Sequence, residues 1–205
     1  MPEALKRTRT QIERREEAIS RMVDSAIELI ANKGIQTVTM AEIGVHAGYS
    51  RGLPYQHFGT KEKIIEAILE SVIERFNARR KHNNAPQPGL ESIKSLVSTY
   101  LDREEADWTL SKAFIVIMAE ASLPDSKHRE LVIQHNRKNL QFLKKHLRIA
   151  RENREIQSTV PDEDLAVILM GTMRGIVLQT LSDKEINLQS LHVGMLKVLD
   201  VTLGA

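Results

Sequence analysis

The chain has 205 residues, with 29 Lys and Arg, 27 Asp and Glu, and no cysteine. It is long enough to bury a core in one or two domains, and without cysteine it can form no disulfide and perform no thiol chemistry. The net charge of +2 is too small to indicate a nucleic-acid partner by itself. The N-terminus lacks the apolar core of a signal peptide and no uninterrupted apolar run approaches a membrane span, so we expect a soluble, cytoplasmic protein with no membrane partner.

The first predicted helix covers about residues 12–33. Gly34 ends it, because glycine readily takes the left-handed conformation found after a helix. Its apolar residues recur at the helical spacing and form one face: Ile19, Met22, Val23, Ala26, Ile27 and Ile30. Few aromatic residues and no alternating Val- or Ile-rich runs favour an all-α fold.

A short capped helix is predicted next. Thr39 precedes Glu42 by the spacing of a capping box, and Val38 and Ile43 occupy the two positions of a hydrophobic staple. The helix should end near residues 46–47, and Gly48 can reverse the chain in the left-handed conformation.

The following helix, about residues 51–57, is intrinsically weak. Ser50 is its expected cap, Gly52 would lie in its interior, and Pro54 would lack an amide needed at the fourth position. We therefore expect Tyr55 and Phe58 to support it by packing inward. Its polar side carries hydrogen-bond donors and little bulk, which suits close approach to phosphates and base edges.

Residues 38–62 thus have the order helix, glycine turn, helix, start of a third helix. Together they resemble the DNA-binding domain of the TetR family of bacterial transcriptional regulators, through Thr39, Ile43, Ala47, Gly48, Ser50, Gly52, Tyr55, His57, Phe58, Lys61 and Glu62. The resemblance covers about residues 18–67 and departs from the family at Pro54, where a larger apolar residue is usual. The remainder is similar in architecture alone. The implied domains are a helix-turn-helix domain at 10–65 and a helical effector-binding and dimerisation domain at 66–205.

The resemblance implies a ligand-responsive, homodimeric repressor that a small, largely apolar effector of unknown identity releases from a palindromic double-stranded operator. A helix-turn-helix regulator controlled by a protein partner is the alternative. Arg51 and Gln56 are the candidates for base-edge contacts. The full DNA-binding set is Thr39, Ser50, Arg51, Gly52, Tyr55, Gln56, His57 and Lys61. Basic residues between Lys6 and Arg15 form either a solvated terminus or an arm along phosphates.

A long helix at about 61–80 is expected to bridge the two domains, and a loop follows before Gly89. Five helical stretches come after it. The one at 108–121 contains consecutive apolar residues, 114–118, and should be buried on every side. The next, at 126–153, carries His135 and His146 on its apolar stripe. These polar groups either form hydrogen bonds in the core or line an effector cavity, for which the candidates are Trp108, Phe114, Met118, His135, Asn139, Phe142, His146 and Met173.

The last two helices are predicted from Pro161 onward and at about 188–203. Gly171 and Gly175 form a pair at the spacing of close helix packing. By the resemblance, the two helices form a four-helix dimer interface through Leu165, Leu169, Thr172, Ile176, Leu191, Met195 and Leu199. Burial of these side chains inside one subunit is the alternative. We find no nucleophile elbow, phosphate loop or metal-ligand spacing, and expect neither catalysis nor a cofactor or metal.

Overall fold

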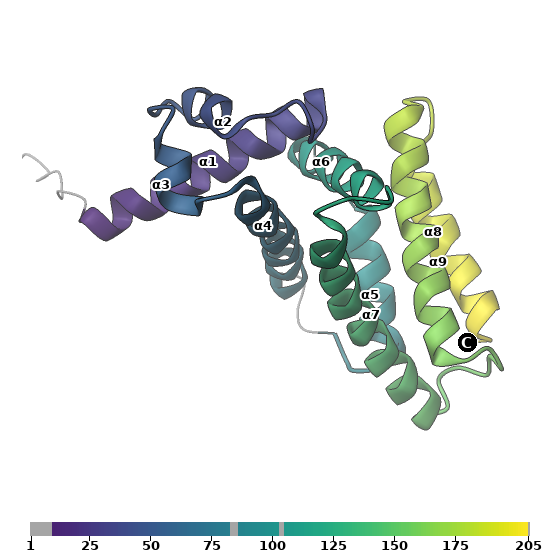
Figure 1. Ribbon diagram of the computed structural model, residues 1–205. Helices are drawn as coiled ribbons and strands as arrows, with labels where there is room; N and C mark the ends of the chain where they lie inside the picture. The colour runs from purple at the N-terminus through teal and green to yellow at the C-terminus, as the bar shows by residue number, and fades with distance from the viewer. Residues whose placement is uncertain (1–9, 83–85, 103–104, 205) are drawn as a thin grey trace, which may run out of the picture.

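The computed structural model describes residues 10–82, 86–102 and 105–204, which form α-helices joined by turns and no strand (Figure 1). The predicted all-α fold is confirmed. In chain order the helices are α1 (Gln11–Lys33), α2 (Met40–His46), α3 (Leu53–Phe58), α4 (Lys61–His82), α5 (Leu90–Leu101), α6 (Glu105–Ala121), α7 (Arg129–Glu152), α8 (Asp162–Ser182) and α9 (Leu188–Leu203). The basic positions Lys6, Arg7 and Arg9 lie outside the described residues.

Helix α1 begins one residue earlier than predicted, because a capping box absent from the sequence interpretation fixes its start. The Thr10 hydroxyl accepts from the Glu13 amide at 3.2 Å, and the Glu13 carboxylate accepts from the Thr10 amide at 2.8 Å. Thr39 caps α2 as predicted by accepting from the Glu42 amide. The Glu42 carboxylate pairs with Lys33, which is the first cause of its lowered pKa, with a further contribution from the Thr39 amide.

One apolar core joins the helix-turn-helix to the helices that follow. Its fully buried centre comes from α1, α2 and the first half of α4: Met22, Ile30, Ile43, Ile64, Ile65 and Ile68. Ile117 of α6 and Val132 of α7 belong to the same cluster. Gln36, in the turn after α1, donates to the Glu120 carboxylate of α6. Figure 1 shows α1 to α3 and α6 together at one end of the molecule.

A second core fills the opposite end, where α5, α7, α8 and α9 run side by side (Figure 1). Leu143 and Leu147 of α7 pack there against Leu165 of α8 and Leu199 of α9, all fully buried. His146 belongs to this structural region, since its Nδ1 accepts the Gly89 amide at 3.2 Å. Helix α8 is also long and apolar enough to cross a membrane, which the sequence analysis did not expect. In the subunit, 39% of its most apolar stretch is buried.

The α2–α3 turn differs from the prediction in three respects. Helix α3 begins at Leu53 with Gly52 as its N-cap, so Ser50 does not cap it through its side chain. Pro54 occupies the second helical position, where no intrahelical hydrogen bond needs its amide. Tyr55 is 54% exposed and does not pack inward. The support comes from buried Pro54, with Leu53 and Phe58 partly buried against the core.

Gly44 allows α2 and α3 to approach. A Cβ atom added at Gly44 would lie 2.5 Å from the Ser50 carbonyl oxygen and 2.9 Å from Pro54 Cδ. Both atoms belong to the tight turn and first helical residues that follow α2, so neither can move away easily. The departure from the family pattern at Pro54 is therefore matched by a small residue on the opposing helix.

We predict that Gly44→Ala lowers the free energy of unfolding by about 1–3 kcal/mol, because the added methyl overpacks the α2–α3 contact. Urea denaturation followed by circular dichroism measures the change. Gly52→Ala is the matched control, since a Cβ atom there meets no described atom within 4 Å. The free energy of unfolding of Gly52→Ala should fall by no more than about 1 kcal/mol. Equal losses in the two variants would mean that the close approach is not a constraint.

Candidate functional site

The helix-turn-helix surface consists of the polar residues around α3. Arg51, Gly52, Tyr55 and Gln56 are exposed, as are Thr39 and Ser50, whereas His57 and Lys61 are half-buried. The short α3 therefore presents its polar side to solvent, and its assignment to DNA remains a prediction. Lys61 has a structural role besides, because its ammonium donates to the Ile35 carbonyl and burial lowers its pKa.

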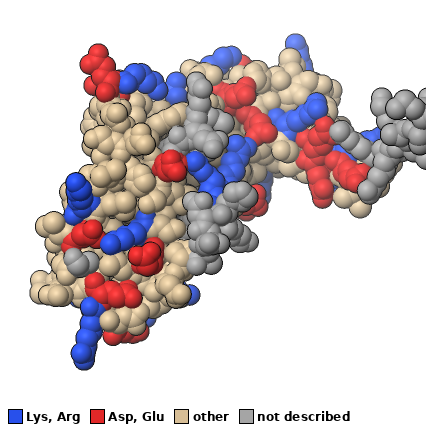
Figure 2. Space-filling model, turned by 180° about the vertical axis from the view of Figure 1, so that it is seen from behind, with Lys and Arg blue, Asp and Glu red and all other residues tan. Residues whose placement is uncertain are grey.

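The outer surfaces of α8 and α9 form a second candidate site. Among the described residues it carries most of the exposed large apolar side chains: Val167, Ile168, Leu178, Leu191, Val193, Val198 and Val201. Figure 2, which views the molecule from behind, shows large uncharged areas over the side where these helices lie. We call this set the outer face. Exposed large apolar side chains gathered on two neighbouring helices are typical of an interaction site.

Four of the predicted dimer residues are wrong. Leu165, Leu169, Met195 and Leu199 are at most 5% exposed and belong to the second core, so they cannot reach a partner. Thr172 and Leu191 are exposed, and Ile176 is half-buried. Close packing at Gly171 and Gly175 is also absent among the described residues of the subunit, because a Cβ atom at either position meets none of them within 4 Å.

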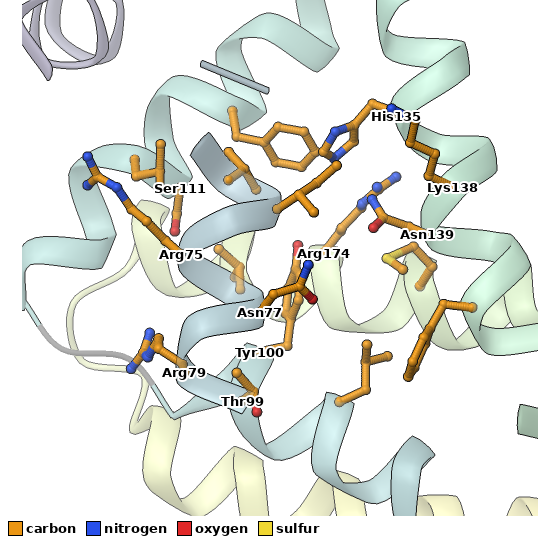
Figure 3. Close-up of a pocket in the computed structure, with 18 of the residues that line it drawn as sticks. Arg75, Asn77, Arg79, Thr99, Tyr100, Ser111, His135, Lys138, Asn139 and Arg174 are labelled. Atoms are coloured by element: carbon orange, nitrogen blue, oxygen red, sulfur yellow. The ribbon is translucent and has the colours of Figure 1, made fainter. Parts of the chain in front are cut away.

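A cavity of about 260 Å³ opens between α4, α5, α6, α7 and α8. Of the predicted effector-binding residues, Phe114, His135, Asn139 and Phe142 line it (Figure 3). Four others do not line it. Met173 is fully buried in the second core, Met118 packs with the first core, the Lys184 ammonium lies over the Trp108 ring, and His146 bonds the Gly89 amide.

Several polar residues of the cavity were not predicted from the sequence. They come from three helices that are distant in sequence: Arg75, Asn77 and Arg79 of α4, Thr99 and Tyr100 of α5, and Arg174 of α8. Arg174 was not among the predicted effector-binding residues. Figure 3 shows its side chain near the middle of the cavity, close to Tyr100 and Asn139.

His135 is a buried, neutral side chain. It is 5% exposed, its ring centroid lies 5.1 Å from that of Phe114, and its Nδ1 has no hydrogen-bond partner among the described residues. Burial lowers its pKa to about 4, helped by the positive charges of Arg174 and Lys138. His135 can therefore offer a hydrogen bond to a ligand but no charge at neutral pH.

Arg174 is the deepest cation of the cavity. One guanidinium nitrogen, Nη2, donates to Asn136 Oδ1 at 2.8 Å, and the guanidinium carbon lies 5.4 Å from the centroid of the Phe114 ring. Burial lowers its pKa, while the neighbouring Tyr100 opposes that shift. Its buried Nε has no hydrogen-bond partner among the described residues.

Helix α4 connects the cavity to the helix-turn-helix. Its first half contributes Ile64, Ile65 and Ile68 to the first core, and its second half places Val72 and Ile73 in the cavity wall. An ion pair between Arg75 and Asp24 ties this second half to α1. Among the described residues no cluster of His, Asp and Glu could hold a metal ion.

We predict that acid destabilises the wild-type protein more than a His135→Leu variant. Below pH 6.5 the unfolded chain takes up a proton that folded His135 binds only near pH 4, so this contribution to stability is complete above pH 6.5 and is lost toward pH 4. Between these pH values the wild type should lose roughly 3 kcal/mol more. Urea denaturation at a series of pH values measures it. If the free energy of unfolding fell equally with pH in both proteins, folded His135 would be solvated.

Comparison with known proteins agrees with this geometry. Residues 22–68 match the family described as bacterial regulatory proteins, tetR family. The HTH-type transcriptional regulator SrpR of Pseudomonas putida is 27% identical over 187 residues, covering 88% of this chain and 83% of SrpR. The HTH-type transcriptional regulator BetI of Brucella suis biovar 1 (strain 1330) is 30% identical over 140 residues, covering 65% of this chain and 69% of BetI.

Two solved structures show the same fold at low sequence identity. A TetR-family transcriptional regulator from Rhodococcus sp. has a TM-score of 0.81 at 20% identity, covering 92% of this chain and 99% of that one. SmeT, solved as a complex with triclosan, has a TM-score of 0.72 at 20% identity, covering 90% of both chains. The resemblance found in the sequence is confirmed: the chain belongs to the TetR family of helix-turn-helix, DNA-binding transcriptional regulators.

Proposed function

We propose that the chain is a homodimeric repressor that leaves a palindromic operator when a small, largely apolar effector fills the cavity. One observation carries this proposal: α4 contributes both to the core of the helix-turn-helix and to the cavity wall. The DNA-binding unit is residues 10–65 and the effector and dimerisation unit is 66–205. The whole protein would bind DNA and effector and would catalyse no reaction. It would act in the cytoplasm, where operator DNA lies.

The helix-turn-helix surface is the proposed DNA contact. Exposed Arg51 and Gln56 would reach base edges, while Thr39, Ser50 and Tyr55 would hold phosphates and set the register. Exposed Gly52 allows close approach of the backbone. His57 and Lys61 are half-buried and would contact DNA with the part of each side chain that stays accessible.

The outer face of α8 and α9 is the proposed dimer interface. Its side chains are apolar, and Gly171 and Gly175 leave room for a second helix to approach the α8 backbone. Of the predicted interface residues, Thr172, Ile176 and Leu191 are accessible to a partner and are retained in the proposed interface. A two-fold axis there would place two α3 helices in successive major grooves, about 34–36 Å apart.

Coupling would run through packed helices. A ligand against Val72, Ile73 and Phe114 touches α4 and α6 together, and Phe114 also belongs to the first core. Close-packed cores shift between discrete arrangements more readily than they deform. A tilt of α4 would therefore change the spacing of the two α3 helices, and about 1–3 kcal/mol of coupling would change operator occupancy 5- to 150-fold.

Control by a protein partner is the second candidate, and SmeT in its complex with triclosan supports the small-molecule proposal by analogy of fold alone. The cavity distinguishes the two candidate functions. A protein partner would act on the surface and would not require Phe114, Asn139 or Phe142 to line an internal space.

We predict that Tyr55→Ala raises the Kd for a duplex enriched from random sequence by the wild-type protein at least about tenfold, because an exposed anchoring contact is lost. Fluorescence anisotropy measures binding, and sedimentation should show an unchanged dimer, since Tyr55 is 54% exposed. Tyr55→Phe is the matched control that keeps the ring and removes the hydroxyl. Unchanged affinity in the alanine variant would remove Tyr55 from the DNA contact.

We predict that Ile168→Glu on the outer face converts the dimer to a folded monomer. Each interface would bury two unpaired carboxylates, which should weaken dimerisation roughly 100-fold or more. Sedimentation velocity measures the oligomeric state. Operator affinity should fall when the dimer is lost. Leu123→Glu is the matched control, an exposed apolar residue beyond α6 and away from the outer face. A dimer that survives Ile168→Glu would place the interface elsewhere.

A further inference from the structure

We propose that the effector carries an anionic oxygen head group, such as a carboxylate, on an apolar body, and that Arg174 binds this head group. This inference rests on the proposed function, because it identifies the chemical class of ligand for the same cavity. It follows from the charge balance of the lining, the unsatisfied geometry of one guanidinium, and the distribution of apolar surface around it.

The cavity lining is cationic. Arg75, Arg79, Lys138 and Arg174 contribute to it, and none of the described lining residues is an Asp or Glu. Arg75 is paired with Asp24 on α1, and the Arg79 guanidinium donates to the Asp102 carbonyl at 2.6 Å. Lys138 is exposed at the surface of α7. Arg174 is thus the cation that lies inside the cavity.

The described partners of Arg174 are all uncharged. They are the Asn136 amide oxygen, the face of the Phe114 ring and the Tyr100 hydroxyl. Its Nε is buried and has no hydrogen bond to a described residue. A guanidinium taken out of water is poorly stabilised by neutral groups alone. The planar, forked guanidinium can bind two oxygens of one carboxylate or phosphate. A ligand anion would therefore supply the negatively charged acceptor that the described partners of Arg174 lack.

The surroundings of Arg174 suit an amphipathic anion. Leu96, Phe142, Met170 and Val177 provide apolar walls, and the Asn139 amide adds a donor near the guanidinium. His135 is neutral at physiological pH and brings no competing charge. A ligand bound here would place its head group at Arg174 and its apolar body along the remaining wall.

The same features disfavour a quaternary ammonium ligand. Such cations are bound by aromatic faces or carboxylates. One face of the Phe114 ring is already occupied by the Arg174 guanidinium, and no described lining residue is acidic. A ligand cation would also be repelled by Arg174. The cavity therefore discriminates by the sign of charge and not by size alone.

Isothermal titration calorimetry with three head groups on one chain length tests this inference. The ligands are octanoate, octan-1-ol and octyltrimethylammonium, titrated into the full-length protein. Octanoate should bind roughly tenfold or more tightly than either of the others. Arg174→Met should remove that preference while leaving octan-1-ol binding within about threefold. Arg148→Met is the matched control for net charge, since Arg148 is exposed on α7 and outside the cavity, and it should behave as the wild type.

A conservative variant protects the test against misfolding. Arg174→Lys keeps the charge but not the fork, so it should retain part of the octanoate preference, and thermal unfolding of each variant establishes that it is folded. Equal or tighter binding of octyltrimethylammonium, or a preference that persists in Arg174→Met, would overturn the inference and leave the proposed function standing. Octanoate binding without any change in operator affinity would overturn the coupling alone. Absence of binding by all three ligands would overturn both this inference and the proposed effector role of the cavity.

Discussion

The packing of α4 against α1, α2 and α6 is the constraint on which the rest of the structure depends. Ile64, Ile65 and Ile68 are completely buried, and each such side chain contributes on the order of 2 kcal/mol by its removal from water. The helix-turn-helix therefore has no separate core that could move independently of α4. Because the other half of the helix forms a wall of the cavity, a ligand that moved this wall would act directly on the helices proposed to contact DNA.

Local signals allowed much of this end of the molecule to be predicted from sequence. The Thr39 cap and the left-handed Gly48 depend on neighbouring residues only, and both are found in the structure. The start of α3 was mispredicted because its determinant is tertiary. The close contact between Gly44 and Pro54 sets where the turn ends and the helix begins, and a side-chain cap at Ser50 is not needed once that contact positions the backbone.

Helices α8 and α9 show the limit of periodicity. Leu165 and Leu169 on α8 face the core, yet Val167 and Ile168 on the same helix are more than half exposed. When both sides of a helix are apolar, spacing identifies two faces but does not say which one the subunit itself covers. The predicted interface consequently included the inner face of each helix. The cavity posed a related difficulty, because its polar residues come from helices whose proximity only the tertiary fold defines.

Arg174 shows how a departure from good packing can identify function. Replacement of a buried charge by an apolar residue of similar size is often neutral or stabilising, so stability gives no reason for a guanidinium that meets only an amide, a phenyl ring and a phenol among the described residues. Residues that break the rules of a well-packed interior are typical of sites where binding sets the requirement. Arg174 belongs to α8, which carries part of the outer face, and it lines the same cavity as residues of α4. An anion bound to it would therefore contact the two elements whose relative position the proposed switch must change.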